Sequence, residues 1–165
     1  MEFYKSNQIE FFEDKVVHQS AGGFVFHEAT ENQILYVALL QKPDGKFYIP
    51  KGHILKGEEP DKAALREVKE ELMLEKSNPR VVTKVGVISY TFTLPDDKRI
   101  HYKNVHLYIF ELPLKEKIRP LEREDFVSAE WLEFNDALEK MAFDKENLLK
   151  ARQLFYSNKT ISSKS

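Results

Sequence analysis

Three glutamates and one arginine crowd into the seven-residue stretch REVKEEL, which begins at Arg66. At about 100° per residue, Glu67, Glu70 and Glu71 fall together on one side of a helix. Like charges three or four residues apart repel, by about a few tenths of a kcal/mol per pair. Either Arg66 and Lys69 neutralise an ordinary solvated helix face, or the carboxylates share divalent cations.

The residues before this stretch favour the second alternative, in which the carboxylates share divalent cations. Five residues separate Gly52 from Glu58, and seven more separate Glu58 from Arg66. Together with the acids, this spacing resembles the Nudix box, G-x5-E-x7-R-E-U-x-E-E-x-G-U, in which U is aliphatic. The chain is thus identified as a member of the Nudix hydrolase family. One position departs: Met73 stands where the family has a glycine, and we expect the helix end to shift by a residue or so to avoid a left-handed methionine.

The resemblance implies roles for the charged residues of the box. Glu70 and Glu71 would be metal ligands, and Glu67 would be either a ligand or the base that activates water. Arg66 would hold Glu67 in its working rotamer through a charge-assisted hydrogen bond. The predicted catalytic residues are therefore Glu67, Arg66 and Glu70.

Carboxylate oxygens are hard ligands that suit Mg²⁺, with Mn²⁺ as the alternative cofactor. Such ions can bridge to a diphosphate, neutralise its charge and orient a water for in-line attack on phosphorus. By resemblance, the carbonyl of Gly52 would join the metal shell, and Glu58 would tie the preceding loop to the helix.

The family often adds a metal-binding carboxylate from beyond the box. An acidic segment precedes Trp131, and there we favour Glu124 and Asp125 as metal ligands. Glu122 and Glu111 are weaker candidates. The alternative for all four is a charged surface loop or strand end.

The entry to the box, Pro-Lys-Gly-His, is similar to the asymmetric dinucleoside tetraphosphate hydrolases of the family. Lys51 and His53 would then both donate hydrogen bonds to a phosphate chain. Their alternatives are a solvated lysine and a loop-stabilising histidine. Lys103 resembles the phosphate-contacting lysine of the same enzymes, although a strand-edge lysine can also serve to prevent aggregation.

Two tyrosines, Tyr90 and Tyr102, are candidates for stacking on a nucleobase, although aromatic residues in strands commonly belong to the core. His101 and His106 have no metal-ligand spacing, and we interpret them as structural or surface residues.

The resemblance predicts a metal-dependent pyrophosphohydrolase that splits diadenosine tetraphosphate into ATP and AMP. The alternatives are removal of pyrophosphate from RNA 5′ ends, and hydrolysis of ADP-ribose or of diphosphoinositol polyphosphates. A non-catalytic nucleotide-binding Nudix domain is a further alternative, but such domains usually lose box carboxylates that are all present here.

The elements that must position these residues follow from apolar periodicity and turn signals. The order of strands and helices predicts a mixed sheet flanked by helices, and the resemblance implies that this is the Nudix-type α/β/α sandwich. We expect a single domain over residues 1–158 with a flexible tail over 159–165. The expected strands are 19–28, 32–42, 47–50, 80–94, 100–112 and 126–134, and the expected helices are 59–72, 135–141 and 146–156.

Bulk composition limits the function classes. The 165 residues carry a net charge of -2, which gives no basic excess for wholesale nucleic-acid binding, and no cysteine, which removes disulfides and thiolate metal sites. No apolar run reaches the ~20 residues needed to span a bilayer. We expect a cytoplasmic monomer or homodimer that binds a small nucleotide and no membrane.

Overall fold

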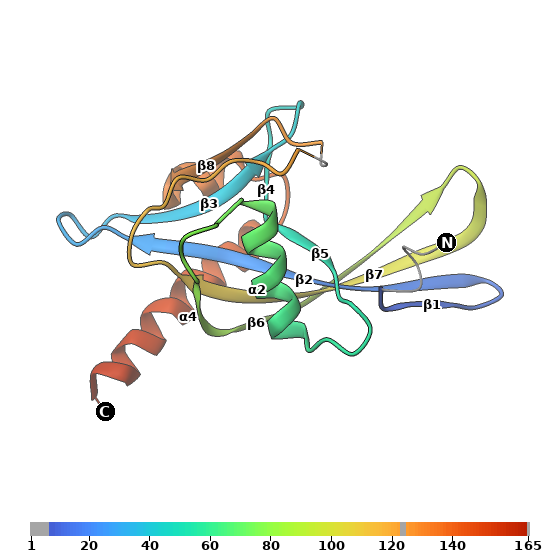
Figure 1. The fold of residues 1–165 in the computed structure, drawn as a ribbon, viewed down its shortest axis with the longest axis horizontal. Helices are drawn as coiled ribbons and strands as arrows, with labels where there is room; N and C mark the ends of the chain where they lie inside the picture. The colour runs from blue at the N-terminus through green and yellow to red at the C-terminus, as the bar shows by residue number, and fades with distance from the viewer. Residues whose placement is uncertain (1–6, 123–124, 165) are drawn as a thin grey trace.

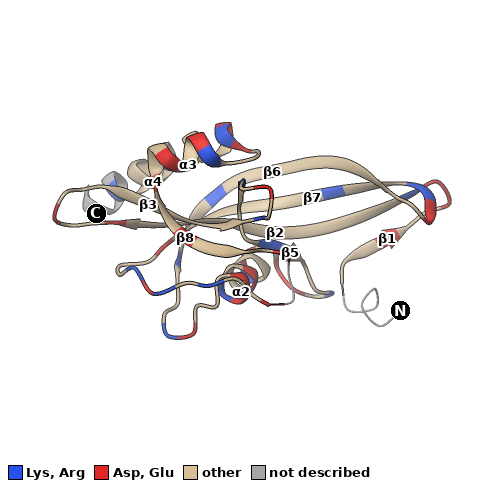
Figure 2. Ribbon diagram, turned by 90° about the horizontal axis from the view of Figure 1, so that it is seen from above, with Lys and Arg blue, Asp and Glu red and all other residues tan. Residues whose placement is uncertain are grey.

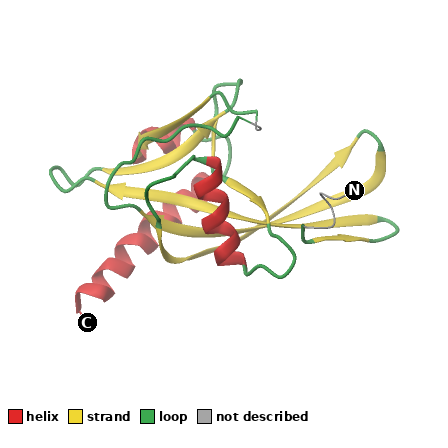
Figure 3. Cartoon of the chain, viewed as in Figure 1, coloured by secondary structure: helices red, strands yellow, loops and turns green. Residues whose placement is uncertain are grey.

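One mixed sheet of eight strands forms the centre of the computed structural model, which describes residues 7–122 and 125–164 (Figures 1 and 3). The strands are β1 (Ile9–Phe11), β2 (Lys15–Glu28), β3 (Leu35–Gln41), β4 (Phe47–Tyr48), β5 (Lys51–His53), β6 (Arg80–Leu94), β7 (Asp97–Glu111) and β8 (Ser128–Glu133). The helices are α2 (Pro60–Glu71), α3 (Phe134–Lys140) and α4 (Lys145–Lys164).

The long strands β2 and β7 pair in parallel at the middle of the sheet, in the order β4-β3-β2-β7-β6. β6 and β7 form a hairpin that projects well beyond the helices (Figure 1). β1 and β5 both pair with β2, and β8 pairs with β3. β2 therefore brings the N-terminal segment, the strand that enters the box and β7 side by side.

The helices cover opposite faces of this sheet. α2 lies on one face and α3 and α4 lie on the other, as Figure 2 shows from above. Each face has its own apolar core: Val68 and Leu72 of α2 pack with Phe110, while Phe155 of α4 packs with Phe26. The predicted α/β/α sandwich is confirmed.

Helix α2 begins with Pro60 in its first turn, where a missing N–H costs nothing. At its other end Met73 has a φ of 53° and takes the left-handed conformation itself. The N–H of Met73 donates to the carbonyl of Glu70, and the N–H of Leu74 donates to that of Lys69, which is the Schellman pattern. The expected shift of the helix end is wrong: methionine occupies the glycine conformation because these two bonds and buried Leu74 fix the turn.

Where we expected a loose tail over residues 159–165, helix α4 continues to Lys164. Lys159 pairs with Glu28 of β2 and Glu111 of β7, which joins this last part of the helix to the sheet. β1 and β5 were not predicted, because three-residue strands carry too little periodicity to recognise. Among the described residues, no helix is long and apolar enough to cross a membrane.

Candidate active site

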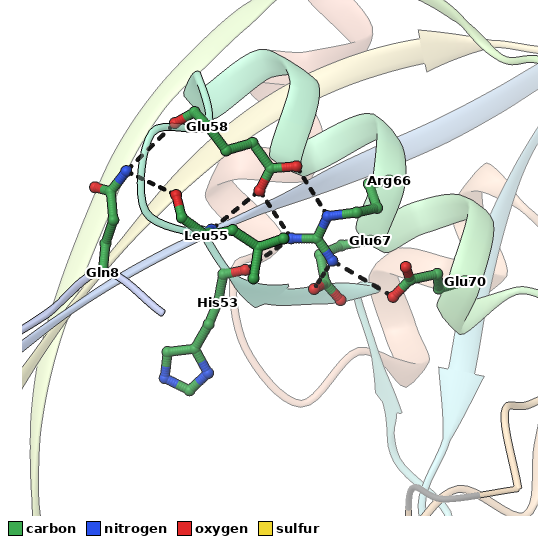
Figure 4. A network of polar contacts seen from close by, with 7 residues as sticks. All are labelled: Gln8, His53, Leu55, Glu58, Arg66, Glu67 and Glu70. Atoms are coloured by element: carbon green, nitrogen blue, oxygen red, sulfur yellow. Dashed lines mark hydrogen bonds and ion pairs between the residues drawn. The ribbon is translucent and has the colours of Figure 1, made fainter. Parts of the chain in front are cut away.

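Arg66 on α2 is the centre of the box. Its guanidinium donates two hydrogen bonds of 2.9 Å to the carboxylate of Glu58 and one of 2.9 Å to the backbone carbonyl of His53 (Figure 4). Glu58 in turn accepts a 3.0 Å hydrogen bond from the backbone N–H of Leu55. The predicted tie between loop and helix through Glu58 is confirmed, and Arg66 is what completes it.

The remaining nitrogen of Arg66, Nη1, faces the helix carboxylates. It lies 2.7 Å from Glu67 and 3.4 Å from Glu70, so the predicted bond between Arg66 and Glu67 is confirmed. Hydrogen bonds from Arg66 lower the pKa of Glu58 despite the opposing effect of burial, and Glu58 and Glu67 raise the pKa of Arg66. Glu58 and Arg66 are therefore charged at neutral pH.

The acidic face of α2 is not a solvated surface. Glu67 is 9% exposed and Glu71 is 5% exposed, whereas the side chain of Glu70 is 45% exposed. Burying carboxylates costs free energy unless cations or hydrogen bonds compensate it. The interpretation of this helix face as an ordinary solvated surface is thus wrong for Glu67 and Glu71.

Gly52 on β5 allows the backbone to approach Glu67 very closely. A Cβ atom at Gly52 would lie 2.1 Å from a carboxylate oxygen of Glu67, so any side chain there would displace it. Because side chains alternate along a strand, Lys51 and His53 lie on the other side of β5 from this contact. The glycine places backbone and carboxylate oxygens together at one edge of the sheet.

A cavity of about 1030 Å³ joins the acids of α2 to a group of basic side chains. Lys51 and Lys103 both line it, and the Lys51 ammonium donates a 3.2 Å hydrogen bond to the hydroxyl of Tyr90. Burial lowers the pKa of Lys103, an effect that Tyr90 opposes and Lys51 reinforces. Two cations facing buried carboxylates across one cavity suit a bound polyanion.

His53 also lines the cavity, and its ring contacts a second histidine. Nε2 of His53 lies 3.3 Å from Nδ1 of His18 on β2. Burial, with Lys103 and His18 nearby, lowers the pKa of His53 to about 4, so the ring is neutral at neutral pH. His101, which we interpreted as structural or surface, is buried and bonds to His18, whereas His106 contacts Lys84.

The structure brings Tyr90 into the cavity but not Tyr102, which is 40% exposed and absent from its lining. Three other aromatic residues line it instead, none of which was predicted from the sequence. Tyr48 packs edge-on against Phe143 at 5.9 Å between ring centroids, and Phe126 follows the acidic segment. Phe143 is 67% exposed, which is unusual for so large an apolar ring. This exposure becomes visible only once the fold is known.

None of the downstream candidate carboxylates that the structure describes lines the cavity. Asp125 is exposed and does not line it, and neither does Glu122. Glu111 forms ion pairs with Arg80 and Lys159 at the far end of β7. Glu124 lies outside the described residues.

The segment before β1 contributes to the site as well. Asn7 is 4% exposed and lines the cavity. The Gln8 side chain donates to the backbone carbonyls of Leu55 and Glu58, which holds the loop that enters α2 (Figure 4). No pattern in the sequence connected these residues with the box.

The donor set suits a divalent cation of the Mg²⁺ type. Glu67, Glu70 and Glu71 supply hard oxygens, and the close approach of Gly52 adds its backbone. In this structure Arg66 turns Glu67 and Glu70 toward itself, and the described residues contain no group of three acids or histidines arranged to hold a metal. Glu70 would have to leave Arg66 to act as a ligand.

Comparisons with known proteins agree with this geometry. A family model for the NUDIX domain matches residues 16–151. A Mycobacterium tuberculosis protein named MutT4 is 33% identical over 143 residues, which are 82% of this chain and 54% of that protein. The chain therefore spans about half the length of that curated relative.

Solved structures share the fold at low sequence identity. A C. elegans Ap4A hydrolase in a binary complex has a TM-score of 0.63 at 20% identity, over 85% of this chain and 98% of that one. An E. coli dihydroneopterin triphosphate pyrophosphohydrolase has a TM-score of 0.61 at 18% identity, over 82% of this chain and 92% of that one. The NUDIX domain of Shewanella oneidensis NrtR, complexed with ADP ribose, has a TM-score of 0.60 at 16% identity, over 87% of this chain and 89% of that one.

Proposed function

The chain belongs to the NUDIX domain family, and from this premise we propose that it is a metal-dependent pyrophosphohydrolase of nucleoside polyphosphates. One observation carries the proposal: the carboxylates of α2 and the ammonium groups of Lys51 and Lys103 line the same cavity. Acids alone would suit a cation, and lysines alone would suit an anion. Their combination suits a phosphate chain bound together with divalent ions.

Glu67, Glu70, Glu71 and the carbonyl of Gly52 are the groups that would hold Mg²⁺ or Mn²⁺. The bound ion supplies charge neutralisation at the phosphates and lowers the pKa of a coordinated water. The contact between Arg66 and Glu70 is the longest in the Arg66 network and the most exposed, so Glu70 is the carboxylate most easily released to a cation.

The protein's own residues would orient the reaction. Arg66 holds Glu67 in one rotamer, which suits Glu67 to accept the proton of the attacking water. Lys51 and Lys103 are placed to contact phosphate oxygens and to stabilise the leaving polyphosphate. The water oxygen bonds to the attacked phosphorus as the bond from that phosphorus to the bridging oxygen breaks.

We propose diadenosine tetraphosphate as the substrate, with ATP and AMP as products. A cavity of about 1030 Å³ is at the upper end of the size range for small-molecule sites, as an extended dinucleotide requires. Its aromatic residues come from separate elements, Tyr90 from β6 and the pair Tyr48 and Phe143 from β4 and the segment before α4, which would provide stacking surfaces for two bases. A C. elegans Ap4A hydrolase has the same fold.

Triphosphorylated RNA 5′ ends are the second candidate substrate, because they also present a polyphosphate on a nucleoside. ADP-ribose, to which the similar NrtR domain is bound, and diphosphoinositol polyphosphates follow. A domain that binds nucleotide without cleaving it is less well supported, since Arg66, Glu67, Glu70 and Glu71 are all retained.

A side-by-side assay with Mg²⁺ tests the proposal. Diadenosine tetraphosphate, 5′-triphosphorylated RNA, ADP-ribose and a diphosphoinositol polyphosphate are compared by kcat/KM, with products separated by ion exchange. We expect diadenosine tetraphosphate to be cleaved fastest, to ATP and AMP in equal amounts. Turnover of ADP-ribose or RNA at the same or a higher kcat/KM would reject diadenosine tetraphosphate as the preferred substrate. If none of the four compounds were turned over, the proposed pyrophosphohydrolase activity would be rejected.

A further inference from the structure

A line of hydrogen-bonded imidazoles leads from His53 in the cavity to the tip of the β6–β7 hairpin. Nδ1 of His18 lies 3.3 Å from Nε2 of His53, and Nε2 of His18 lies 2.8 Å from Nδ1 of His101. Nε2 of His101 lies 2.9 Å from Oδ2 of Asp97, where the hairpin turns. We call these four residues the histidine network.

Strand pairing accounts for this arrangement. In the parallel pair of β2 and β7, Val16 is opposite His101, so His18 and His101 are diagonal neighbours on one face of the sheet. β5 pairs with β2 so that Ser20 is opposite His53, which again places His18 diagonally. Three separate strands therefore bring the imidazoles together.

The network is shielded and ends in an obligate acceptor. His18 and His101 are 6% and 3% exposed, and the ring of Phe92 packs against both, 5.4 and 5.0 Å away. Hydrogen bonds from Arg99 hold the pKa of Asp97 well below its usual range, so Asp97 is a carboxylate that can only accept. The Arg99 guanidinium also donates two bonds of 2.9 Å to that carboxylate.

This polarity fixes each proton along the network. A His101 ring with one proton must donate from Nε2 to Asp97, so its Nδ1 carries no proton and accepts from Nε2 of His18. Nδ1 of His18 then carries no proton either and accepts from Nε2 of His53. His53 is thereby the tautomer with its proton on Nε2 and none on Nδ1.

We propose that Asp97, His101 and His18 are positioning residues that fix the ring and the tautomer of His53, so that His53 meets the substrate as a hydrogen-bond acceptor at Nδ1. His53 would then not donate to a phosphate oxygen, contrary to the expectation from the sequence. Its part in binding substrate rests on the proposed function, but the tautomer does not.

Nitrogen NMR of the full chain tests the tautomer directly. Two-bond proton–nitrogen correlations distinguish a ring protonated on Nε2 from one protonated on Nδ1. We expect the Nε2 form at His18 and His53 in the wild type and mixed tautomers in H101F, whose phenyl ring can still stack on Phe92 but cannot accept from His18. R99A is the matched control: it removes the ion pair of the turn, keeps Asp97 beside His101 and should leave both tautomers unchanged.

A second variant guards against misfolding of H101F. Asp97 lies in the half-exposed turn, so D97A creates no buried cavity, yet it removes the terminal acceptor and should also mix the tautomers. A wild-type His53 protonated on Nδ1 would overturn the proposal. So would H101F and D97A spectra in which His18 and His53 keep the wild-type form.

Kinetics then separate positioning from a merely structural role. We expect H101F to lower kcat/KM by about fivefold, the equivalent of one orienting hydrogen bond of about 1 kcal/mol. In an H53F background the same substitution should cost nothing further, because its effect passes through His53. If H101F lowered kcat/KM by the same factor in the H53F background as in the wild type, His101 would not act through His53. If no substrate is turned over, the proposed function fails while the NMR result still decides the tautomer.

Discussion

Replacing Met73 by glycine should relieve backbone strain, because Met73 occupies a left-handed conformation with a φ of 53° at the end of α2. That conformation costs an L-residue about 1–2 kcal/mol. Glycine adopts it freely but gives back about 0.4–1 kcal/mol through the greater freedom of its unfolded chain. The net backbone gain is therefore roughly 0.5–1 kcal/mol.

Met73 is half-buried, so the substitution also removes side-chain contacts. M73A is the matched control, since it loses nearly the same contacts and keeps the backbone penalty. In urea unfolding, M73G should exceed M73A by roughly 0.5–1 kcal/mol with unchanged m, and its melting temperature should be higher by about 1–4 °C. Activity should stay at the wild-type level, because Met73 does not line the cavity.

Equal stability of M73G and M73A would refute this reasoning. It would mean that the helix end of the protein in solution does not use the two Schellman bonds donated by Met73 and Leu74, and that the chain ends the helix in another way.

Three further predictions concern the site. E58Q should lose about 2 kcal/mol of stability at neutral pH, measured by urea unfolding in EDTA, because Arg66 loses a charged acceptor. Arg66 lowers the pKa of Glu58 in the folded state, so this stabilisation is complete above the ordinary carboxyl pKa and disappears as pH falls through the lowered value. If the stability difference between E58Q and wild type persisted in acid, it would not arise from the charge of Glu58. E70Q should lower kcat by about a hundredfold or more, the loss of a few kcal/mol of charge stabilisation, with the fold retained, and unchanged turnover would exclude Glu70 as a ligand. K103M should raise KM for the polyphosphate by about tenfold, the loss of one charged hydrogen bond, while the exposed K98M should not, and equal effects would remove Lys103 from the site.

The box and the order of the main elements could be predicted from the sequence, because both depend on the spacing of residues that are close together in the chain. Alternation predicted the long strands β6 and β7, and a helical period predicted α2. The bonds from Arg66 to Glu67 and from Glu58 to the loop were expected from the resemblance to the Nudix box, and both are present.

What the sequence could not supply depends on strand pairing. No local pattern connects His18, His53 and His101, which are joined only because β5 and β7 both pair with β2. The same holds for Asn7, which a β-bridge to Leu55 places at the cavity. Residues that lie far apart in sequence meet through register, and a one-residue change of register would have sent each side chain to the opposite face.

The structure also explains how one helix tolerates three neighbouring carboxylates. Their repulsion is answered unequally: Arg66 bonds tightly to Glu67 at 2.7 Å and loosely to Glu70 at 3.4 Å, while two further bonds fix the guanidinium on Glu58. Releasing Glu70 would therefore leave Arg66 fixed and Glu67 oriented. A site built this way can turn one exposed carboxylate toward an arriving cation without giving up the bonds that hold the box together, which is why we expect E58Q to affect folding and E70Q to affect turnover.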